Sequence, residues 1–459
     1  MNLNFMKNDW KSQATIILIH AALMQLTMNF VANFINVILP DIAKDLNITI
    51  ETLNLLSLFF LIAVITVLIP LSKYINQYGI KRCTRIIIIV LIGGLILSAI
   101  TYSFELLLIS RVIQGICIAI LPTINYILIM LALPHSEAGK TLGIVSSCGY
   151  IGMTIAPSVT GFVAYYFSWR MTFLLMIPVL IFDLFLMNYI KEEWSVENKS
   201  IDYVGSILYG LIMILFILSV IDIQLINFVL FILTVIFIII FIVYEKRIEY
   251  PVYNLNLMKN VKYIIGNFGG LVSYFIVFIT TYTLSLYLQV ILGLDSKTAG
   301  LFLLITPIAM VFVTPYAGKL ADKYDPIIIS GIGMTIITSS LVILTCIDIL
   351  PEYMILVALI LQGIGHGMFS PSNNKDILTS VQDKDLSDAS ALLNTGKEIG
   401  KIFGLAIFNF ICIMLMDNSN LENNILGLSH SIHYTLVVGS ILGGLSVISL
   451  IYSKYWIKS

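Results

Sequence analysis

Long apolar segments constrain the fold of this 459-residue chain more than any other feature. About 20 apolar residues span the hydrocarbon core of a bilayer, and fourteen segments of about that length or longer lie between charged residues, Pro or Gly. They cover residues 12–37, 50–71, 84–103, 106–131, 141–165, 169–190, 203–221, 225–244, 263–292, 299–318, 326–347, 352–373, 388–416 and 432–453. A membrane β-strand would instead show about 10 residues of alternating polarity. The sequence therefore predicts an all-α polytopic membrane protein with 14 transmembrane helices.

The placement of basic residues predicts the orientation of these helices. Charged residues make up only 11% of the chain, whereas a soluble domain has about 25%. With the N-terminus inside, nineteen Lys and Arg residues of the loops are cytoplasmic, and only Lys44 and Lys297 lie outside. The first apolar run is longer than that of a cleaved signal peptide, so we expect it to remain as the first helix. These patterns predict the cytoplasmic membrane, with both termini cytoplasmic.

Short sequence matches recur along the chain at a nearly constant offset. Residues 72–78 (SKYINQY) align with 318–324 (GKLADKY) at an offset of 246 residues, and Gln114-Gly115 aligns with Gln362-Gly363 at 248. The offset fits six helices plus an insertion of two, and an even number gives both halves the same orientation. We therefore expect an N-terminal six-helix bundle in 1–195, two inserted helices and a cytoplasmic linker in 196–262, and a C-terminal six-helix bundle in 263–459.

Arg111 is the only full charge in the segment 106–131. Inserting an arginine there costs about 2.5 kcal/mol or more, so we expect its side chain to face a polar cavity or a partner. Arg111 also lies only about two helical turns from one end of the segment, from which it could snorkel to the interface. The residue by itself leaves both interpretations open. Its repeat position holds Leu359, so the charge is asymmetric between the halves.

Arg111, Gln114 and Gly115 form the pattern Arg-x-x-Gln-Gly. With this pattern and the repeat, the sequence resembles the major facilitator superfamily, specifically its 14-helix drug:proton antiporter branch, over essentially its full length. The resemblance implies the major facilitator fold, with two six-helix bundles plus two inserted helices. It also implies that Arg111 and Gln114 belong to the substrate and proton pathway.

Residues 72–81 and the second copy from Gly318 resemble the family loop that reads roughly Gly-x-x-x-Asp-Arg-x-Gly-Arg-Lys. The first copy keeps Gly79 and the basic end but has Asn76 in place of the acid, and the second keeps Asp322. Such a loop can tie helix ends together through charge-assisted hydrogen bonds and so hold one gating state. A basic loop that only sets topology is the alternative. The expected gating residues are Asn76, Gly79, Lys81, Arg82, Gly318 and Asp322.

Residues 152–161 (GMTIAPSVTG) resemble the Gly-x-x-x-Gly-Pro-x-x-Gly-Gly signature in the fifth helix of drug exporters. Gly152, Ala156 and Gly161 would let another helix approach closely, while Pro157 bends the helix. Ordinary small-residue packing explains the glycines equally well.

A polar stripe marks the first segment. Asn29, Asn33 and Asn36 follow i, i+4, i+7 spacing and share one helix face. We expect the stripe to line a cavity and bind a substrate, with interhelical hydrogen bonds as the alternative. Asn36 begins a stretch similar to the family's Asn-Val-Ala-Leu-Pro, but Val31 stands where the family's acidic residue is expected. That change removes a usual site for a cation or a proton.

Other ionisable residues are candidates for carrying protons. Glu398 lies in a stretch similar to the family's Asn-Thr-x-Arg-Gln-x-Gly, although Lys401 on the same face could pair with it. His366 lies in the segment that the repeat relates to that of Arg111, and histidine titrates near neutral pH. Asp183 is a weaker candidate on a peripheral helix, and His20 is expected to be packed.

Several other classes of site are not expected. The five cysteines are scattered without CxxC spacing, which argues against disulfides and metal clusters. Gly139-Lys140-Thr141 resembles the end of a phosphate loop, but Pro134 stands in place of its first glycine. We expect no enzyme activity, no cofactor, no metal and no nucleic-acid partner.

The sequence thus predicts a secondary active exporter of small lipophilic compounds, of the multidrug efflux type, working by alternating access. Proton antiport is implied by the resemblance alone. The expected partners are a small-molecule substrate, protons and the lipid bilayer, and the chain is expected to be a monomer. The alternatives are a dedicated exporter of a neutral or anionic metabolite or lipid, and a membrane sensor that does not transport.

Overall fold

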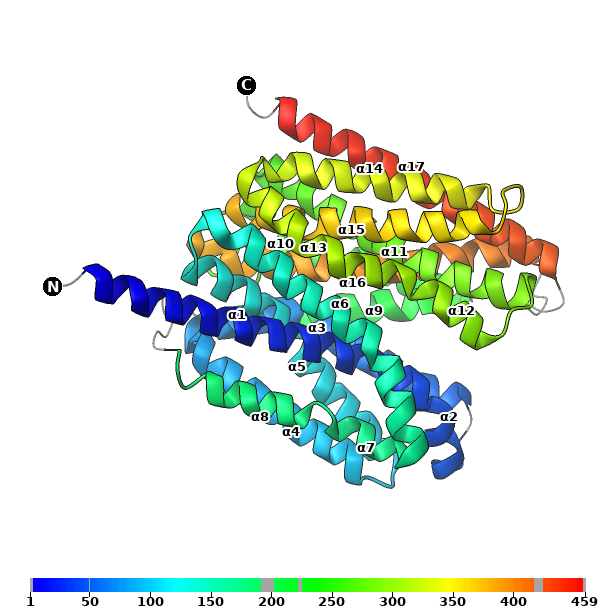
Figure 1. Cartoon of the computed structure of the whole chain (residues 1–459), viewed down its shortest axis with the longest axis horizontal. Helices are drawn as coiled ribbons and strands as arrows, with labels where there is room; N and C mark the ends of the chain where they lie inside the picture. Colours follow the sequence, from blue (N-terminus) through cyan, green and yellow to red (C-terminus); the bar gives the residue numbers. More distant parts are fainter. Residues whose placement is uncertain (1–2, 49, 191–201, 222–224, 417–423, 457–459) are drawn as a thin grey trace.

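The computed structural model describes residues 3–48, 50–190, 202–221, 225–416 and 424–456, and the regular elements in these ranges are helices. The long helices run alongside one another, and both chain termini lie at the same end of the bundle (Figure 1). We call this end the terminal end and the opposite end the distal end. Within the described ranges, thirteen segments are long and apolar enough to cross a membrane, and Val229–Glu245 adds a shorter apolar helix. The prediction of an all-α membrane protein is confirmed.

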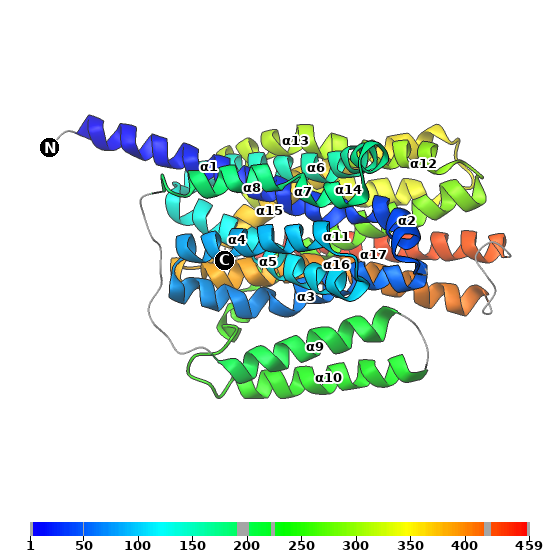
Figure 2. The same cartoon turned by 90° about the horizontal axis from the view of Figure 1, so that it is seen from below.

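The fold consists of two units, each with six membrane segments, and an inserted pair of helices. Some of the segments are divided into two helices. The first unit contains α1 (Leu3–Asn33), α2 (Ile35–Leu46), α3 (Ile50–Tyr78), α4 (Ile80–Ile100), α5 (Phe104–Ala132), α6 (His135–Tyr166), α7 (Trp169–Leu174) and α8 (Ile177–Leu186). The second contains α11 (Val261–Leu286), a π-helical turn (Tyr287–Ile291), α12 (Ser296–Leu303), α13 (Ile305–Lys323), α14 (Pro326–Thr345), α15 (Tyr353–Thr379), α16 (Leu386–Met416) and α17 (Ile425–Trp456). Between them lie α9 (Tyr203–Ile221), α10 (Leu225–Glu245) and a short 3-10 helix (Leu255–Lys259). The pair α9 and α10 lies outside the main bundle, along one side of it (Figure 2).

Prolines divide two of the predicted membrane segments. The segment 169–190 is split into α7 and α8, and α7 ends at Leu174, four residues before Pro178. The segment 299–318 is likewise split, because α12 ends at Leu303, four residues before Pro307. Proline lacks an N–H donor, and its ring clashes with the carbonyl group four residues earlier, so a helix breaks at that point. The prediction of single continuous helices was wrong here, and also in the first segment, where a turn at Phe34 separates α1 from α2.

Equivalent close contacts in the two units confirm the internal repeat. A Cβ atom built on Gly115 would lie 2.6 Å from the Phe60 carbonyl oxygen and 2.9 Å from the Ala63 Cβ. A Cβ atom on Gly363 would lie 2.5 Å from the Thr306 carbonyl oxygen and 2.6 Å from the Cβ of Ala309. In both units a glycine therefore lets two helices approach closely at corresponding positions.

Buried apolar side chains join the two units. Buried apolar side chains form two clusters, of which the second lies within the second unit. The first cluster fills the first unit and extends into the second, to Ile377 and Leu378 of α15 and to Leu386, Ala389, Ala391, Leu393 and Ile402 of α16. Most of these residues lie toward the terminal ends of their helices, and Ile402 lies near the middle of α16. The apolar core is therefore continuous between the units from the terminal end to the middle of α16.

Candidate functional site

Arg111 lies inside the first unit and is fully buried, so its side chain does not snorkel to an interface. Its Nη1 donates to the Gln114 Oε1 at 2.8 Å, and its guanidinium stacks over the Phe60 ring, 4.2 Å from the ring centroid. Gln114 in turn donates to the Ser98 Oγ at 2.8 Å. Among the described residues, no carboxylate pairs with Arg111, and its Nε and Nη2 have no hydrogen-bond partner. An aromatic ring and an amide therefore accompany this charge in place of an acid.

The asparagine stripe of the first helix bonds to its own backbone. The Asn29 amide donates to the Gln25 carbonyl group at 2.9 Å, and the Asn33 amide donates to that of Asn29 at 2.7 Å. Both side chains are half-buried. The side chain of Asn36 lies outside the described part of the structure. The side-chain amide groups of Asn29 and Asn33 therefore already have hydrogen-bond partners in their own helix.

The small residues of α6 pack within the first unit. A Cβ atom on Gly152 would lie 2.3 Å from the Leu26 carbonyl oxygen, so this glycine brings α6 against α1. Ala156 is fully buried, and a Cβ atom built on Gly161 would lie 3.5 Å from the Cγ1 of Val37. Pro157 lies inside the helix without ending it. The predicted exporter signature thus coincides with an intra-unit packing face.

The second gating copy lies across the boundary between the units. Asp322, at the end of α13, accepts hydrogen bonds from the backbone N–H groups of Gly139 and Lys140 at 2.8 and 2.7 Å. It also pairs with Lys375 at 2.6 Å. One turn earlier, Gly318 faces Gly139 so closely that an added Cβ would lie 2.2 Å from the Gly139 carbonyl oxygen. Asp322 and Gly318 therefore hold the terminal ends of α6 and α13 together.

The first gating copy is mainly helical rather than a loop, which corrects the prediction. Helix α3 continues through Tyr78 and ends at Gly79, whose φ of 94° is a conformation that favours glycine. Lys81 and Arg82 then begin α4, and Lys81 donates to the Ile190 carbonyl group within the same unit. The side chain of Asn76 lies outside the described part of the structure. Polar residues extend both helix ends beyond their apolar segments, and this is why the sequence indicated loops.

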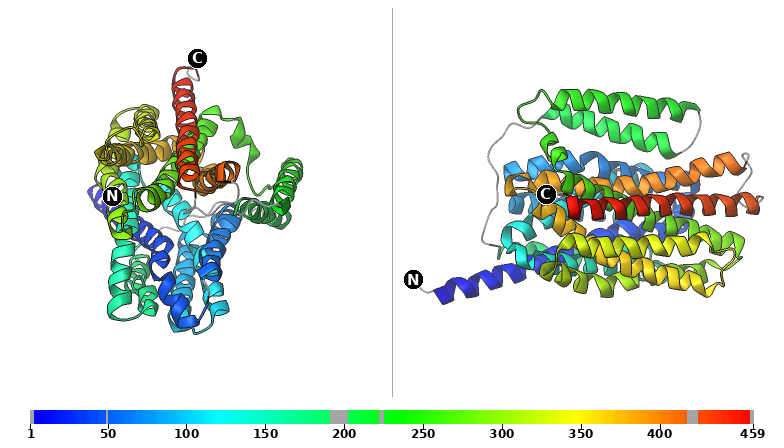
Figure 3. Two further views of the ribbon diagram at one scale, coloured as in Figure 1. Left: turned by 90° about the vertical axis from the view of Figure 1, so that its right-hand side faces the viewer. Right: turned by 90° about the horizontal axis from the view of Figure 1, so that it is seen from above.

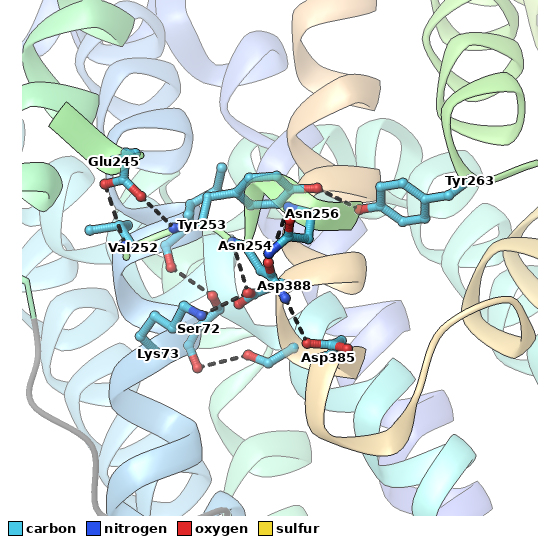
Figure 4. A network of polar contacts seen from close by, with 12 residues as sticks. Ser72, Lys73, Glu245, Val252, Tyr253, Asn254, Asn256, Tyr263, Asp385 and Asp388 are labelled. Carbon is cyan, nitrogen blue, oxygen red and sulfur yellow. Dashed lines mark hydrogen bonds and ion pairs between the residues drawn. The ribbon is translucent and has the colours of Figure 1, made fainter. Parts of the chain in front are cut away.

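A second contact between the units lies at the terminal ends of α3 and α16 (Figure 4). We call its residues, Ser72, Lys73, Asn254, Ser387 and Asp388, the terminal clasp. The Lys73 ammonium pairs with the Asp388 carboxylate at 2.7 Å, and the Ser387 hydroxyl donates to the Ser72 carbonyl group at 2.9 Å. The backbone N–H of Asn254 donates to Asp388 at 3.2 Å. Asp388 thus joins α3, α16 and the chain that follows the inserted pair.

That chain is itself fixed by buried polar contacts (Figure 4). Glu245 accepts hydrogen bonds from the backbone N–H groups of Val252 and Tyr253 at 3.4 and 3.2 Å. The Tyr253 and Tyr263 hydroxyls lie 3.0 Å apart. Burial raises the pKa of the Tyr253 phenol above its usual value. The described chain between α10 and α11 is therefore held next to the terminal clasp by these contacts.

We expect Asp388→Asn to weaken the terminal clasp. The Asp388 side chain is 4% exposed and that of Lys73 29%. The cost of breaking this ion pair is therefore expected to lie between that of an exposed salt bridge and that of a fully buried one. A shift of about 1–2 kcal/mol, roughly 5- to 30-fold, toward a state open at the terminal end is expected. Alkylation of a cysteine introduced at the buried Ala389, in a background without the native cysteines, would measure it. Asp325→Asn, which alters a more exposed pair with Lys454, is the control. An unchanged alkylation rate would contradict the clasp.

Deeper in the bundle, both units contribute to a polar and aromatic group that we call the central cluster: Tyr126, Tyr150, Tyr274, His366 and Lys397. The Lys397 ammonium donates to the Tyr126 hydroxyl at 2.9 Å, across the boundary between α16 and α5. The Nδ1 of His366 lies 2.8 Å from the Ser273 hydroxyl, and its ring meets those of Tyr150 and Tyr274 edge to face. Tyr150 and Tyr274 are partly exposed although they lie near the middle of α6 and α11.

Of the residues predicted to form a pathway, His366 lies against the Tyr274 ring, as does Lys401, the partner of Glu398, whereas Arg111 lies within the first unit. Glu398 is half-buried and pairs with Lys401 at 2.7 Å. His20, which was expected to be packed, and Asp183, the weaker proton candidate, form a fully buried pair at 2.9 Å. Among the described residues, no group of three His, Cys, Asp or Glu could hold a metal ion.

Four residues of the terminal clasp and the central cluster were not predicted as site residues from the sequence: Lys73, Tyr126, Asp388 and Lys397. Asp388 and Lys397 did carry a signal, since both are charged residues within the predicted membrane segment 388–416. Their partners could not be found in this way, because Lys73 lies 315 residues from Asp388 and Tyr126 lies 271 residues from Lys397.

Comparison with known proteins places this geometry in a family. The model of the Major Facilitator Superfamily matches residues 21–200, 198–405 and 266–457. The chain is 25% identical to the riboflavin transporter RibZ of Clostridioides difficile over 88% of each protein. It is also 25% identical to the lincomycin resistance protein LmrB of Bacillus subtilis, over 81% of this chain and 80% of that protein. The human organic anion transporter MFSD10 has the same fold, with a TM-score of 0.68 and 10% identity over 96% of this chain and 99% of that one. Matches over nearly the whole length, together with two repeated six-helix units, show that this chain belongs to the major facilitator superfamily.

Proposed function

We propose that this transporter is a proton-coupled secondary active exporter of small lipophilic compounds that works by alternating access. The observation that carries the proposal is the pair of polar contacts, around Asp322 and Asp388, that join the units at the terminal end. Ion pairs and hydrogen bonds of this kind can break in one state and re-form in another. The relatives, a riboflavin transporter and lincomycin resistance proteins, support a small organic substrate.

In this proposal the moving parts are the bundles 1–195 and 263–459, joined through 196–262. The protein works as a monomer in the cytoplasmic membrane, with the terminal end on the cytoplasmic side. The structure then corresponds to the state that is closed to the cytoplasm. Arg111, Gln114 and the asparagines of the first helix organise the first unit beside the pathway, while His366 and Glu398 lie at its centre.

The alternative, a dedicated exporter of an anionic metabolite, has one observation in its favour. Val31, in place of the expected acid, is 1% exposed and apolar, whereas Lys397 brings a positive charge to the centre of the bundle. A protonated Lys397 would repel a cationic substrate at this position. A membrane sensor without transport has no comparable support.

Transport assays in everted vesicles test the proposal. A panel containing riboflavin, lincomycin and lipophilic dyes would be followed with and without a pH gradient. We expect at least one compound to accumulate in the vesicles, and this accumulation to stop when the gradient is collapsed. Accumulation that persists without the gradient would contradict proton coupling, and no accumulation of any compound would contradict export of this class.

Replacing the acid at the centre should separate proton coupling from binding. We expect Glu398→Gln to reduce accumulation driven by the pH gradient about 10-fold or more, because the amide cannot take up and release a proton. Exchange of substrate across the membrane without a gradient should continue. Glu352→Gln, at an exposed position at the distal end, is the control. Full accumulation driven by the pH gradient in Glu398→Gln would remove this residue as the proton carrier.

A further inference from the structure

Two residues of the central cluster, Lys397 and Tyr126, have hydrogen-bond donors without an acceptor among the described residues. Lys397 is 6% exposed, and in the described part of the chain its ammonium, with three donors, has one hydrogen-bond partner, the Tyr126 hydroxyl. That hydroxyl also accepts from the Asn374 Nδ2 at 3.1 Å, so its two acceptor positions are filled and its own proton is left to donate. The nearby carboxylate of Glu398 is engaged by Lys401. A buried site with unmatched donors fits a ligand that supplies acceptor oxygens.

Aromatic rings surround these donors. The Lys397 ammonium lies 5.0 Å from the centroid of the Tyr126 ring and 5.4 Å from that of Tyr274. The rings of Tyr274 and Tyr150 lie 5.0 and 6.0 Å from the His366 ring, at interplanar angles of 77° and 69°. Tyr150 comes from the first unit and Tyr274 from the second, and both are partly exposed. Flat apolar surfaces with a polar edge are the usual complement of an aromatic ligand.

The position of the cluster suits a substrate site of a protein that alternates between states. The contacts of the terminal clasp and of Asp322 lie on its terminal side, where they close the space between the units. The donors at the cluster come from both units, Tyr126 from α5 and Lys397 from α16. A ligand held by both therefore bears directly on the equilibrium between open and closed states.

We propose that the central cluster binds lipophilic aromatic anions, with the anionic oxygens on Lys397 and the Tyr126 hydroxyl and the ring against Tyr150 and Tyr274. This inference rests on the proposed function and names its substrate class. Of the two lysines near the cluster, Lys401 pairs with Glu398, and Lys397 has no acid in contact among the described residues. An ionised carboxylate or phenolate would stabilise the protonated ammonium of Lys397, whereas a cation would destabilise it.

Binding of three probes with the same ring size tests the inference on the purified full-length protein. The probes are 2-naphthoate, neutral 2-naphthamide and cationic N-methylquinolinium, and the measurement is isothermal titration calorimetry in detergent. We expect 2-naphthoate to bind most tightly and N-methylquinolinium most weakly. Lys397→Met should lower the affinity for 2-naphthoate about 10-fold or more and change that for 2-naphthamide less than about 2-fold, while Lys397→Arg should keep the preference for the anion. Tyr126→Phe should weaken 2-naphthoate by a smaller factor.

The wild-type probe series keeps the inference testable even if a variant fails to fold. Equal or tighter binding of N-methylquinolinium than of 2-naphthoate would overturn the inference, as would unchanged 2-naphthoate affinity in a folded Lys397→Met protein. Vesicle transport separates this outcome from failure of the proposed function. Anion-selective binding without accumulation of any compound would leave the site standing and reject export, whereas accumulation of cations driven by the pH gradient would support export and reject the anion site.

Discussion

Gly318→Ala is expected to reduce transport at least about 10-fold and to hold the terminal end open. The added Cβ would lie 2.2 Å from the carbonyl oxygen of Gly139, and 3.0 Å from its carbonyl carbon, both backbone atoms of α6. Since such a contact cannot be relieved by a side-chain rotation, α6 and α13 must separate. Overpacking of this kind costs about 1–3 kcal/mol, and 1.4 kcal/mol is a factor of ten in an equilibrium. Separation would also lengthen the bonds from Gly139 and Lys140 to Asp322.

Alanine makes this a clean test, because it favours a helix by about 1 kcal/mol over glycine. A loss of transport therefore cannot come from a weaker α13. The matched control is Gly331→Ala in α14, where an added Cβ meets no atom within 4 Å. Alkylation of a cysteine at Ala389 should rise in Gly318→Ala and stay unchanged in the control. Normal transport in Gly318→Ala would show that α6 and α13 need not close during the cycle.

Arg111→Met is expected to abolish most transport without lowering the melting temperature. The guanidinium is fully buried, and two of its nitrogens have no partner among the described residues. Each unsatisfied buried donor costs about 1–3 kcal/mol, while stacking over Phe60 returns about 2 kcal/mol. Replacing buried charges with apolar side chains of similar volume is often neutral or stabilising. The native fold thus carries an arginine that its packing does not require.

Transport per folded molecule, measured with a thermal unfolding curve in the same detergent, checks this prediction. Arg111→Gln should behave like Arg111→Met in transport, because both remove the charge. A transport loss of about 10-fold or more at an unchanged melting temperature would identify a functional charge. A lower melting temperature with normal transport in the surviving protein would instead show that Arg111 is a packing residue.

The sequence predicted those features that depend on neighbouring residues. Apolar length located the membrane helices, and repeated motifs located Gly115 and Gly363 at corresponding helix crossings. Motif resemblance also drew attention to Asp322 and Gly318, which meet α6 across the boundary between the units. These signals are local, because each depends on one segment and its spacing.

Long-range pairing was not predictable from a single sequence. Lys73 could be recognised as a basic loop residue, but nothing near it in the chain indicates Asp388. His20 and Asp183 were both noted, yet their pairing depends on how α1 packs against α8. Motif resemblance predicted that Arg111 belongs to the pathway. In the structure Arg111 bonds to Gln114 within the first unit, whereas Lys397 contacts Tyr126 across the boundary between the units.

The inserted pair has a consequence for the proposed exchange between the two states. Seen along the bundle, α9 and α10 lie at its side (Figure 3). The Tyr209 hydroxyl of α9 donates to the Ile65 carbonyl group of α3 at 3.1 Å and lies 3.4 Å from the Thr395 hydroxyl of α16, so one side chain contacts both units. If the units rock against each other as proposed, at least one of these contacts must break in each cycle, and breaking it would add to the barrier that sets the turnover rate.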